Sequence, residues 1–410
     1  MKQFDIPAIY RSNAIGRVKD IRKKADPRKK DFSPSRLDFG SLEVFLARHF
    51  GFCYGVENAI EISYRTLQEN PGKNVFLLSQ MIHNPHVNDD LHRLGVRFIH
   101  DTEGREILPL ETVKSGDIVI IPAFGTTLEM EEKLRLIGAL TASFNTTCPF
   151  VEKVWNRSEK IGLEGYSIII HGKFRHEETR ATFSHSSRHS KSLVILNMEE
   201  AELLARYIQG ELPVDRFYMD FDGRFSAGFN PESDLDRIGV VNQTTMLASE
   251  TQAIAEYLKG VMFQKYGEAE IKHRFADTRD TLCYATNDNQ QATYALLETG
   301  ADMAIVVGGY NSSNTSHLVE LCEEKLPTYF ISSASEIDSE GGIRHFNIHK
   351  GEMEYTPGFM PKKSKVRLIL TSGASCPDSQ VEEVLTRLLS GMASCRDSET
   401  VLQDFEKAYA

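Results

Sequence analysis

The chain has 410 residues, of which 41% are hydrophobic, and its formal net charge is −11. A chain of this length can bury several cores, so we expect two or three lobes rather than one. The excess of Asp and Glu argues against a general nucleic-acid-binding protein, because phosphate contacts need surplus Lys and Arg. The apolar runs are too short to span a membrane. Six cysteines spread over so long a chain do not indicate a disulfide scaffold.

The N-terminal segment, residues 1–44, contains the basic run RVKDIRKKADPRKK. Its first 40 residues also contain five aspartates. Because transit peptides are poor in acids, we expect a cytoplasmic arm rather than a targeting segment. The chemically informative motifs begin later, so residues 1–40 are expected to be dispensable for the site that those motifs form. The basic run could attract an acidic partner.

From residue 45 onward, short apolar runs alternate with longer amphipathic runs. This pattern predicts an α/β fold with mostly parallel sheets. Three times, a run that leads to a cysteine is followed by two runs that end in polar or small residues. We therefore expect three pseudo-equivalent α/β lobes around one shared site, because ligands bind beyond the carboxyl ends of strands in open sheets. The expected boundaries are 45–140, 141–260 and 261–395, with a C-terminal tail at 396–410.

In the first region, the run LEVFLAR precedes Cys53, which lies within the sequence GFCYG. Glycines on both sides would let a bulky group approach the backbone closely. The next run ends at IHNP, where His83 precedes Asn84 and Pro85, residue types that favour a helix start. The third run ends at AFGTT, around Phe124.

In the second region, Cys148 is followed by Pro149, a residue type favoured at the first helical position. The next run, SIII, leads into HGKFRHEE, which contains His176, Glu177 and Glu178. A histidine beside carboxylates could transfer protons, but a solvated charged loop is equally compatible with this composition. The third run ends at NQTT, which contains Thr244.

In the third region, Cys283 precedes another helix-like run, and the following strands end at YNSSN and TSGASCP. Ser, Thr and Asn are common helix N-caps, so each of these polar residues alone could be a cap. Their shared placement at strand ends instead favours an anionic, hydroxylated ligand. The GxGxxG and P-loop motifs are both absent from the sequence, so neither a dinucleotide site nor an ATP site is indicated.

Three cysteines each precede a helix-like run: Cys53, Cys148 and Cys283. The helix dipole and the unbonded N–H groups of a first turn favour thiolate, which is the form that binds metal. A buried structural role is the alternative for any one cysteine, and we expect it for Cys322 and Cys395, while Cys376 is ambiguous. Three thiolates suit an iron–sulfur cluster better than a catalytic zinc. In a four-iron cluster they would leave one iron open to a substrate oxygen.

Eight motifs occur in order along the chain: GFCYGV, IHNPHV, TCPFV, HGKFRHEET, NQTTM, LCYATNDNQ, YNSSN and TSGASCP. Together they resemble the LytB/IspH family of 4-hydroxy-3-methylbut-2-enyl diphosphate reductases over roughly residues 43–390. The resemblance implies three α/β lobes around a 4Fe-4S cluster. It also implies reductive removal of the substrate hydroxyl to give isopentenyl and dimethylallyl diphosphates, the last step of the methylerythritol phosphate pathway.

The resemblance assigns roles to individual residues of this chain. The cluster ligands match Cys53, Cys148 and Cys283, with one iron left open. The catalytic glutamate matches Glu178, and the threonine of the Gln-Thr-Thr motif matches Thr244 as a substrate contact. The diphosphate-binding positions match His83, His176, Ser312, Ser313, Asn314 and Ser375.

The chain departs from the family pattern in two places. Short members commonly have Ala-His-Gly where this chain has Ala123-Phe124-Gly125, so one diphosphate contact is missing or replaced. Cys376 stands where the family more often has a small or hydroxyl residue, which argues against a role as a ligand. The basic arm and the phenylalanine are similar to the longer plant and cyanobacterial branch.

The resemblance also implies proton delivery through Glu178, and we expect Glu177 to face solvent. Because the sequence carries no nicotinamide or flavin fingerprint, the electrons are expected from a ferredoxin- or flavodoxin-like protein, with no nucleic-acid or membrane partner. Two alternatives remain. An iron–sulfur hydro-lyase would need no net electrons, and a non-enzymatic iron–sulfur sensor would not need so many polar strand ends.

Overall fold

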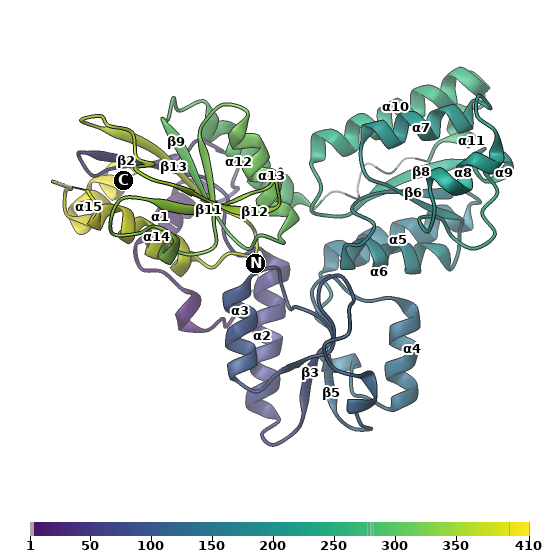
Figure 1. Ribbon diagram of the computed structural model, residues 1–410, viewed down its shortest axis with the longest axis horizontal. Helices are drawn as coiled ribbons and strands as arrows, with labels where there is room; N and C mark the ends of the chain where they lie inside the picture. Colours follow the sequence, from purple (N-terminus) through teal and green to yellow (C-terminus); the bar gives the residue numbers. More distant parts are fainter. Residues whose placement is uncertain (1–3, 277, 279–280, 282, 393, 410) are drawn as a thin grey trace. The chain divides into compact units, whose positions relative to one another are not determined.

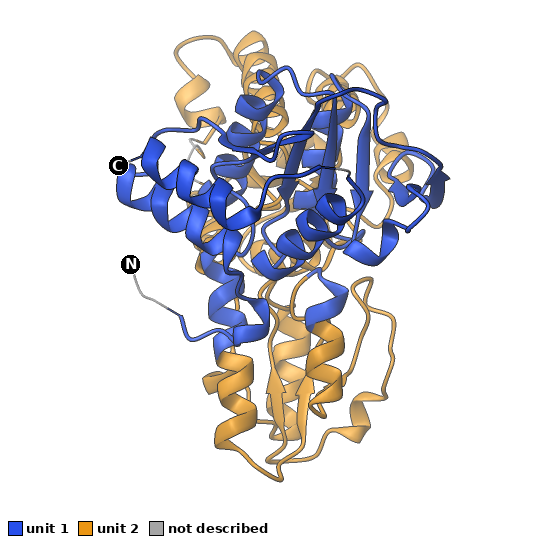
Figure 2. Cartoon of the chain, turned by 90° about the vertical axis from the view of Figure 1, so that its left-hand side faces the viewer, with its two compact units in different colours: residues 1–61, 83–87, 284–410 blue, residues 62–82, 88–283 orange. Residues whose placement is uncertain are grey.

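The computed structural model describes residues 4–276, 278, 281, 283–392 and 394–409. Figure 1 shows the order of the helices and strands along the chain, which divides into two compact units (Figure 2). Unit 1 comprises residues 1–61, 83–87 and 284–410, and unit 2 comprises residues 62–82 and 88–283. Within the described ranges, no helix combines the length and the apolar character needed to cross a bilayer.

Unit 1 is built on a five-stranded sheet. Its strands run in the order β1 (Ser35–Asp38), β2 (Leu42–Leu46), β13 (Val366–Ser372), β9 (Met303–Val307) and β10 (Thr328–Ile331). All neighbours are parallel except β1 and β2. Every residue of β2 and β9 is buried, as expected for parallel strands that are covered on both faces. A separate antiparallel hairpin of β11 (Ile343–Asn347) and β12 (Glu352–Thr356) lies between β10 and β13 in sequence.

The helices of unit 1 form two packed groups. One group pairs α12 (Tyr284–Leu297) with α13 (Ser313–Glu323). The other packs α1 (Ala14–Ala25) against α14 (Asp378–Ser390) and α15 (Ser398–Ala408). Both groups contribute to one apolar core with the central strands. Two more helices, α2 (Tyr54–Glu69) and α3 (Pro85–Arg93), begin in unit 1.

The N-terminal residues are built into unit 1, whereas the sequence suggested a separate arm. Ile15 and Val18 of α1 are buried in the same core as β2 and β13. The guanidinium of Arg22 is also buried, and it donates hydrogen bonds to the carbonyl of Ser33 (2.9 Å) and to the carboxylate of Asp31 (3.0 Å). Residues 14–38 therefore add a helix and an edge strand to the unit.

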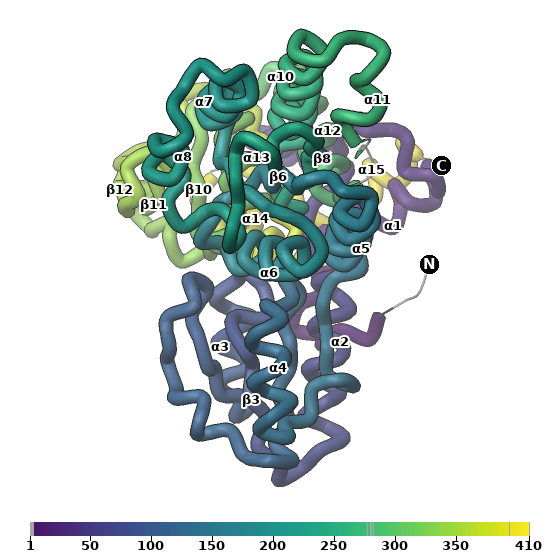
Figure 3. The backbone as a smooth tube through the Cα atoms, turned by 90° about the vertical axis from the view of Figure 1, so that its right-hand side faces the viewer, coloured from purple at the N-terminus to yellow at the C-terminus, as the bar shows by residue number. Residues whose placement is uncertain are grey.

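Unit 2 contains two parallel sheets of three strands. The first has the order β4 (Arg97–Phe98), β3 (Val75–Leu77), β5 (Ile118–Ile120), and the second has the order β7 (Ser192–Ile195), β6 (Ser167–His171), β8 (Ile238–Asn242). Its helices are α4 (Leu128–Ile137), α5 (Pro149–Leu163), α6 (Glu177–Ser187), α7 (Met198–Ile208), α8 (Val214–Asp220), α9 (Pro231–Asp234), α10 (Ala248–Tyr266) and α11 (Ile271–Arg274). Helices α7 and α10 lie side by side (Figure 3).

These sheets confirm the predicted α/β class, but the segments that lead to the cysteines lie in unexpected places. Strand β2, before Cys53, pairs with β13 of the third region and not with β3 or β5. The prediction of a strand before Cys148 is wrong. That segment instead lies alongside the end of β5. Asn145 forms a parallel β-bridge with Ile121, and the N–H of Cys148 donates to the carbonyl of Ala123.

The segment before Cys283 follows the same pattern, because Phe275 forms a bridge with Ile238 of β8, although residues 277, 279, 280 and 282 lie outside the described ranges. The segments before Cys148 and Cys283 thus each bond to the sheet of the region that precedes them. The segment before Cys53, in the first region, bonds to the sheet of the third region. A run such as TASFNTT has few apolar side chains and does not form an independent strand. The division into lobes at 45–140, 141–260 and 261–395 stays a prediction.

Candidate active site

The three candidate cluster ligands all lie at helix starts, as predicted. Cys53 directly precedes α2, Cys283 directly precedes α12, and Cys148 is the N-cap residue of α5, with Pro149 in the first turn. All three side chains are partly exposed. A cysteine in this position is biased towards the thiolate by the N-terminal end of the helix dipole.

Two of the other cysteines are more deeply buried than these three. Cys322 and Cys376 are fully buried. Burial raises the pKa of Cys322 to about 12 and places the pKa of Cys376 still further above its ordinary value. A buried thiol that stays protonated is a poor metal ligand. Cys395 is partly buried, with its Sγ 3.5 Å from the hydroxyl oxygen of Ser41.

The donor set of Cys53, Cys148 and Cys283 fits a soft metal cluster by its chemistry, since all three thiols are accessible and begin helices. Within the part of the chain that the structure describes, no group of three His, Cys, Asp or Glu side chains is gathered in a geometry that would hold a metal ion. Cys53 belongs to unit 1, whereas Cys148 and Cys283 belong to unit 2. Cluster binding by these three residues stays a prediction.

Glu178 lies in the first turn of α6 and is only 1% exposed. Its carboxylate accepts hydrogen bonds from the backbone N–H and from the hydroxyl of Thr244. Burial raises the pKa of Glu178 to about 7 and the negative charge of Glu177 acts in the same direction, while the two hydrogen bonds from Thr244 oppose the rise. The side chain can therefore hold a proton at neutral pH and release it, as a general acid must.

The expectation that Glu177 faces solvent is wrong. Glu177 is 6% exposed, and its carboxylate accepts a hydrogen bond from the hydroxyl of Ser79. The first turn of α6 is buried on several sides, with Glu177, Glu178, Thr179, Ala181 and Thr182 all buried. Two adjacent carboxylates are thus withdrawn from water in the same turn.

His176 is the N-cap residue of α6. Its Nδ1 accepts a hydrogen bond from the backbone N–H of Glu178 at 3.2 Å. An accepting Nδ1 places the proton of the neutral ring on Nε2. The ring of Phe124 meets the ring of His176 edge-on, with the centroids 5.6 Å apart and an interplanar angle of 89°. Phe124 therefore contacts a predicted diphosphate-binding residue from the position where short family members carry a histidine.

Gln243, which was not singled out from the sequence, connects the loops at this end of the second sheet. Its Oε1 accepts hydrogen bonds from the hydroxyl of Thr179 (2.9 Å) and from the N–H of Lys173 (3.1 Å). Its Nε2 donates to the hydroxyl of Thr245 at 2.6 Å. The only signal in the sequence was its place within NQTT, between a buried strand and the two threonines.

The predicted diphosphate positions of unit 1 come together at the ends of the adjacent strands β9 and β13. The hydroxyl of Ser375 donates to the carbonyl of His83 at 3.1 Å, and the N–H of Ala374 donates to Oδ1 of Asn314 at 2.8 Å. Ser312 caps α13 by accepting the N–H of Thr315 at 3.3 Å. His83, Ser312, Ser313, Asn314 and Ser375 are all buried. The remaining candidates, His176, Glu178 and Thr244, belong to unit 2.

The side-chain amide of Asn314 has a donor group that makes no hydrogen bond to the described residues. The side chain is 3% exposed, and its Nδ2 is buried and makes no hydrogen bond to any residue that the structure describes. A buried amide donor without an acceptor is costly. Its place in the first turn of α13 is one where an anion would also be favoured by the helix dipole.

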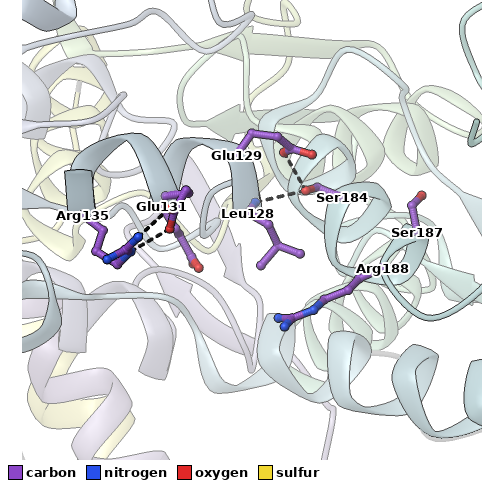
Figure 4. Close-up of a pocket in the computed structure, with 8 residues that line it drawn as sticks. Leu128, Glu129, Glu131, Arg135, Ser184, Ser187 and Arg188 are labelled. Atoms are coloured by element: carbon purple, nitrogen blue, oxygen red, sulfur yellow. Dashed lines mark hydrogen bonds and ion pairs between the residues drawn. The ribbon is translucent and has the colours of Figure 1, made fainter. Parts of the chain in front are cut away.

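A pocket of about 510 Å³ in unit 2 has none of the candidate site residues in its lining (Figure 4). It is lined by Leu128, Glu129, Glu131, Glu132, Arg135, Ser184, Ser187 and Arg188. Ser184 accepts the N–H of Leu128 and donates to Glu129, and Arg135 bonds Glu132. Three carboxylates against two guanidinium groups make this pocket unsuited to a diphosphate.

The fold defines an α/β protein whose polar loops follow the carboxyl ends of parallel strands, where such proteins bind ligands. A family model described as LytB protein matches residues 44–389, and the chain belongs to this family.

Similar proteins include the 4-hydroxy-3-methylbut-2-enyl diphosphate reductase of Synechococcus sp. (strain WH7803), which is 38% identical over 93% of this chain and 90% of that protein. The reductase of the same name from Prochlorococcus marinus subsp. pastoris is 41% identical over 86% of each chain. The solved structure of the E-1-hydroxy-2-methyl-but-2-enyl-4-diphosphate reductase from Plasmodium falciparum shares the fold, with a TM-score of 0.61, 21% identity, and coverage of 90% of this chain and 99% of that chain. The resemblance found in the sequence motifs is thus confirmed.

Proposed function

We propose that this chain reductively removes the hydroxyl group of (E)-4-hydroxy-3-methylbut-2-enyl diphosphate and yields isopentenyl and dimethylallyl diphosphates. Its membership of the LytB family and its similarity to reductases of that name support this reaction. The observation that carries the proposal is the buried Glu178, whose pKa of about 7 suits it to protonate a leaving oxygen at neutral pH.

Cys53, Cys148 and Cys283 would hold a 4Fe-4S cluster with one iron not bound by cysteine. When bound, this cluster would supply electrons to the substrate one at a time. The partial exposure of these thiols at helix starts supports the assignment, in contrast to the raised pKa values of Cys322 and Cys376. The electron source would be a ferredoxin- or flavodoxin-like protein, and the reaction would take place in the cytoplasm.

The substrate diphosphate would bind to His83, His176, Ser312, Ser313, Asn314 and Ser375. The buried Nδ2 of Asn314 supports this assignment, because a phosphate oxygen would accept the hydrogen bond that the described residues do not provide. The N-terminus of α13 adds a favourable dipole for a negatively charged group.

Glu178 would give its proton to the hydroxyl oxygen, which then leaves as water. The carboxylate left behind would be stabilised by the two hydrogen bonds from Thr244. A second proton completes the product at carbon, and the substrate's own diphosphate is a source for it. The reaction thus takes up two electrons and two protons and releases one water.

Anaerobic purification, an iron and sulfide assay and a turnover assay with reduced methyl viologen test the proposal together. We expect product formation that depends strictly on the reductant. An iron–sulfur hydro-lyase would turn over without a reductant, and a sensor would bind a cluster without converting any diphosphate. Either result would refute the proposed reaction.

A further inference from the structure

A basic loop on unit 1 carries five exposed cationic side chains, and it is defined here as residues 23–30, with Lys23, Lys24, Arg28, Lys29 and Lys30. Among the residues that the structure describes, none of these five lies within ion-pair distance of an acidic side chain. Other cations of unit 1 are paired, such as Arg17 with Glu399 and Arg36 with Glu43. The loop therefore presents five cations that form no close ion pair within the described residues.

Two buried arginine side chains form hydrogen bonds with the backbone in and just after this loop. Nη2 of Arg48, a buried residue, donates to the carbonyl of Asp26 at 3.2 Å, and the side chain of Asp26 accepts the N–H of Asp31 at 2.9 Å. The N–H of Lys29 also donates to the carbonyl of Asp26, and Lys29 adopts a positive φ of 53° in this turn. The buried Arg22 anchors the following residues at Ser33. Several hydrogen bonds thus support the backbone that carries the cations.

The basic loop lies beside the helix turns that follow two of the candidate cluster ligands. Lys23 and Lys29 interact electrostatically with Glu57 in the first turn of α2, the helix that follows Cys53. Lys29 also interacts with Asp288 near the start of α12, the helix that follows Cys283.

The same two helix turns carry exposed aromatic side chains. Tyr54 is 38% exposed and Tyr284 is 47% exposed. Aromatic residues are enriched in protein interfaces, so exposed tyrosines at two helix starts are candidates for such a contact. Cations and aromatics therefore occupy the same part of unit 1.

We propose that the basic loop, together with Tyr54 and Tyr284, is the docking surface for a small acidic electron-transfer protein. This inference rests on the proposed function, which requires an external electron donor. Residues 1–40 carry eleven Lys and Arg against five Asp, while the whole chain has a net charge of −11, so the rest of the molecule would repel an acidic donor. Opposite charge at one surface would steer the donor to the cysteine-bearing helices.

A charge-reversal experiment with a matched control tests this surface. The test variant is Lys24→Glu/Lys30→Glu, and the control is Arg344→Glu/Lys362→Glu. All four residues are exposed, belong to unit 1 and carry one positive charge, so the two variants change the net charge equally. Arg344 lies in strand β11, and Lys362 follows the β11–β12 hairpin. Turnover is measured with a reduced plant-type ferredoxin, which is acidic, and with reduced methyl viologen.

In the test variant, we expect the KM for ferredoxin to rise about tenfold at low ionic strength and the difference to shrink as salt is added. Viologen-driven turnover should match that of the unaltered chain, and the control should be normal with both reductants. An unchanged KM for ferredoxin, an equal rise in the control, or a parallel loss of viologen-driven turnover would overturn the docking proposal. If the unaltered chain itself failed to convert the diphosphate with viologen, the proposed function would fall, and a ferredoxin-binding titration would still test the surface.

Discussion

The first turn of α6 places two carboxylates next to each other in a buried setting. Glu178 is bonded to Thr244 and Glu177 to Ser79. Burial favours the neutral form of a carboxyl group, and a neighbouring negative charge raises the pKa further. Burial is thus the main cause of the raised pKa of Glu178, and the charge of Glu177 adds to it.

The Glu178→Gln variant tests the role of this acid directly. Gln keeps the shape and can form a hydrogen bond, but it has no proton to transfer. We expect unchanged iron content, similar affinity for the diphosphate, and turnover lowered by about two orders of magnitude. Steady-state turnover with reduced methyl viologen, beside a binding titration on the same samples, measures both quantities. A fully active variant would refute proton delivery by Glu178.

Glu177→Gln should shift the pH dependence of turnover. The substitution removes the charge that helps to keep Glu178 protonated, so the pKa of Glu178 falls. Because the acid must be protonated to act, turnover is lost as pH rises through that pKa, and the alkaline limb of kcat should move to lower pH. Glu202→Gln, at an exposed position of α7, is the control and should leave the limb in place. Identical profiles for both variants would show that Glu177 has only a structural role.

At the scale of the elements, the cysteine positions could be predicted from the sequence, but the strand pairing could not. A cysteine followed by Pro149 and an amphipathic run is a local signal for a helix start, and α5 begins there. The partner of β2 depends on a strand that comes late in the chain, and no local pattern encodes that choice. The burial of Glu177 was missed for the same reason, because it depends on Ser79, which is distant in sequence.

The helix-start cysteines should be separable from the others by mutation. Cys53→Ser, Cys148→Ser and Cys283→Ser are each expected to lose iron and the visible absorbance of a cluster. Cys322→Ala is the control, with alanine chosen because a serine hydroxyl would be buried without a partner. Iron analysis and absorption spectra after anaerobic purification make the comparison. Loss of iron in the Cys322 variant alone would contradict the assignment of the ligands.

At the scale of the whole molecule, we expect the N-terminal segment to contribute to stability, because its helix α1 packs into the core of unit 1. That residues 1–40 are dispensable for the site formed by the later motifs stays a prediction. Ile15 is fully buried in the core of unit 1. Ile15→Ala should lower the free energy of unfolding by about 2–5 kcal/mol, because it leaves a cavity as well as losing apolar burial. Ile9→Ala is the control, since Ile9 is 60% exposed. Denaturant unfolding measures both, and equal stabilities would mean that α1 is not coupled to the core.

The pairing of β2 with β13 has a consequence during synthesis of the protein. Leu42 of β2 bonds alongside Val366 of β13, and unit 2 is encoded almost entirely between them. At typical translation rates, roughly 15–65 seconds separate the emergence of the two strands from the ribosome. Throughout that interval β2, whose residues other than Glu43 are apolar, has only the edge strand β1 beside it and lacks its parallel partner. The nascent chain should therefore be a client of ribosome-associated chaperones through residues 42–46, long before the last third of the polypeptide exists.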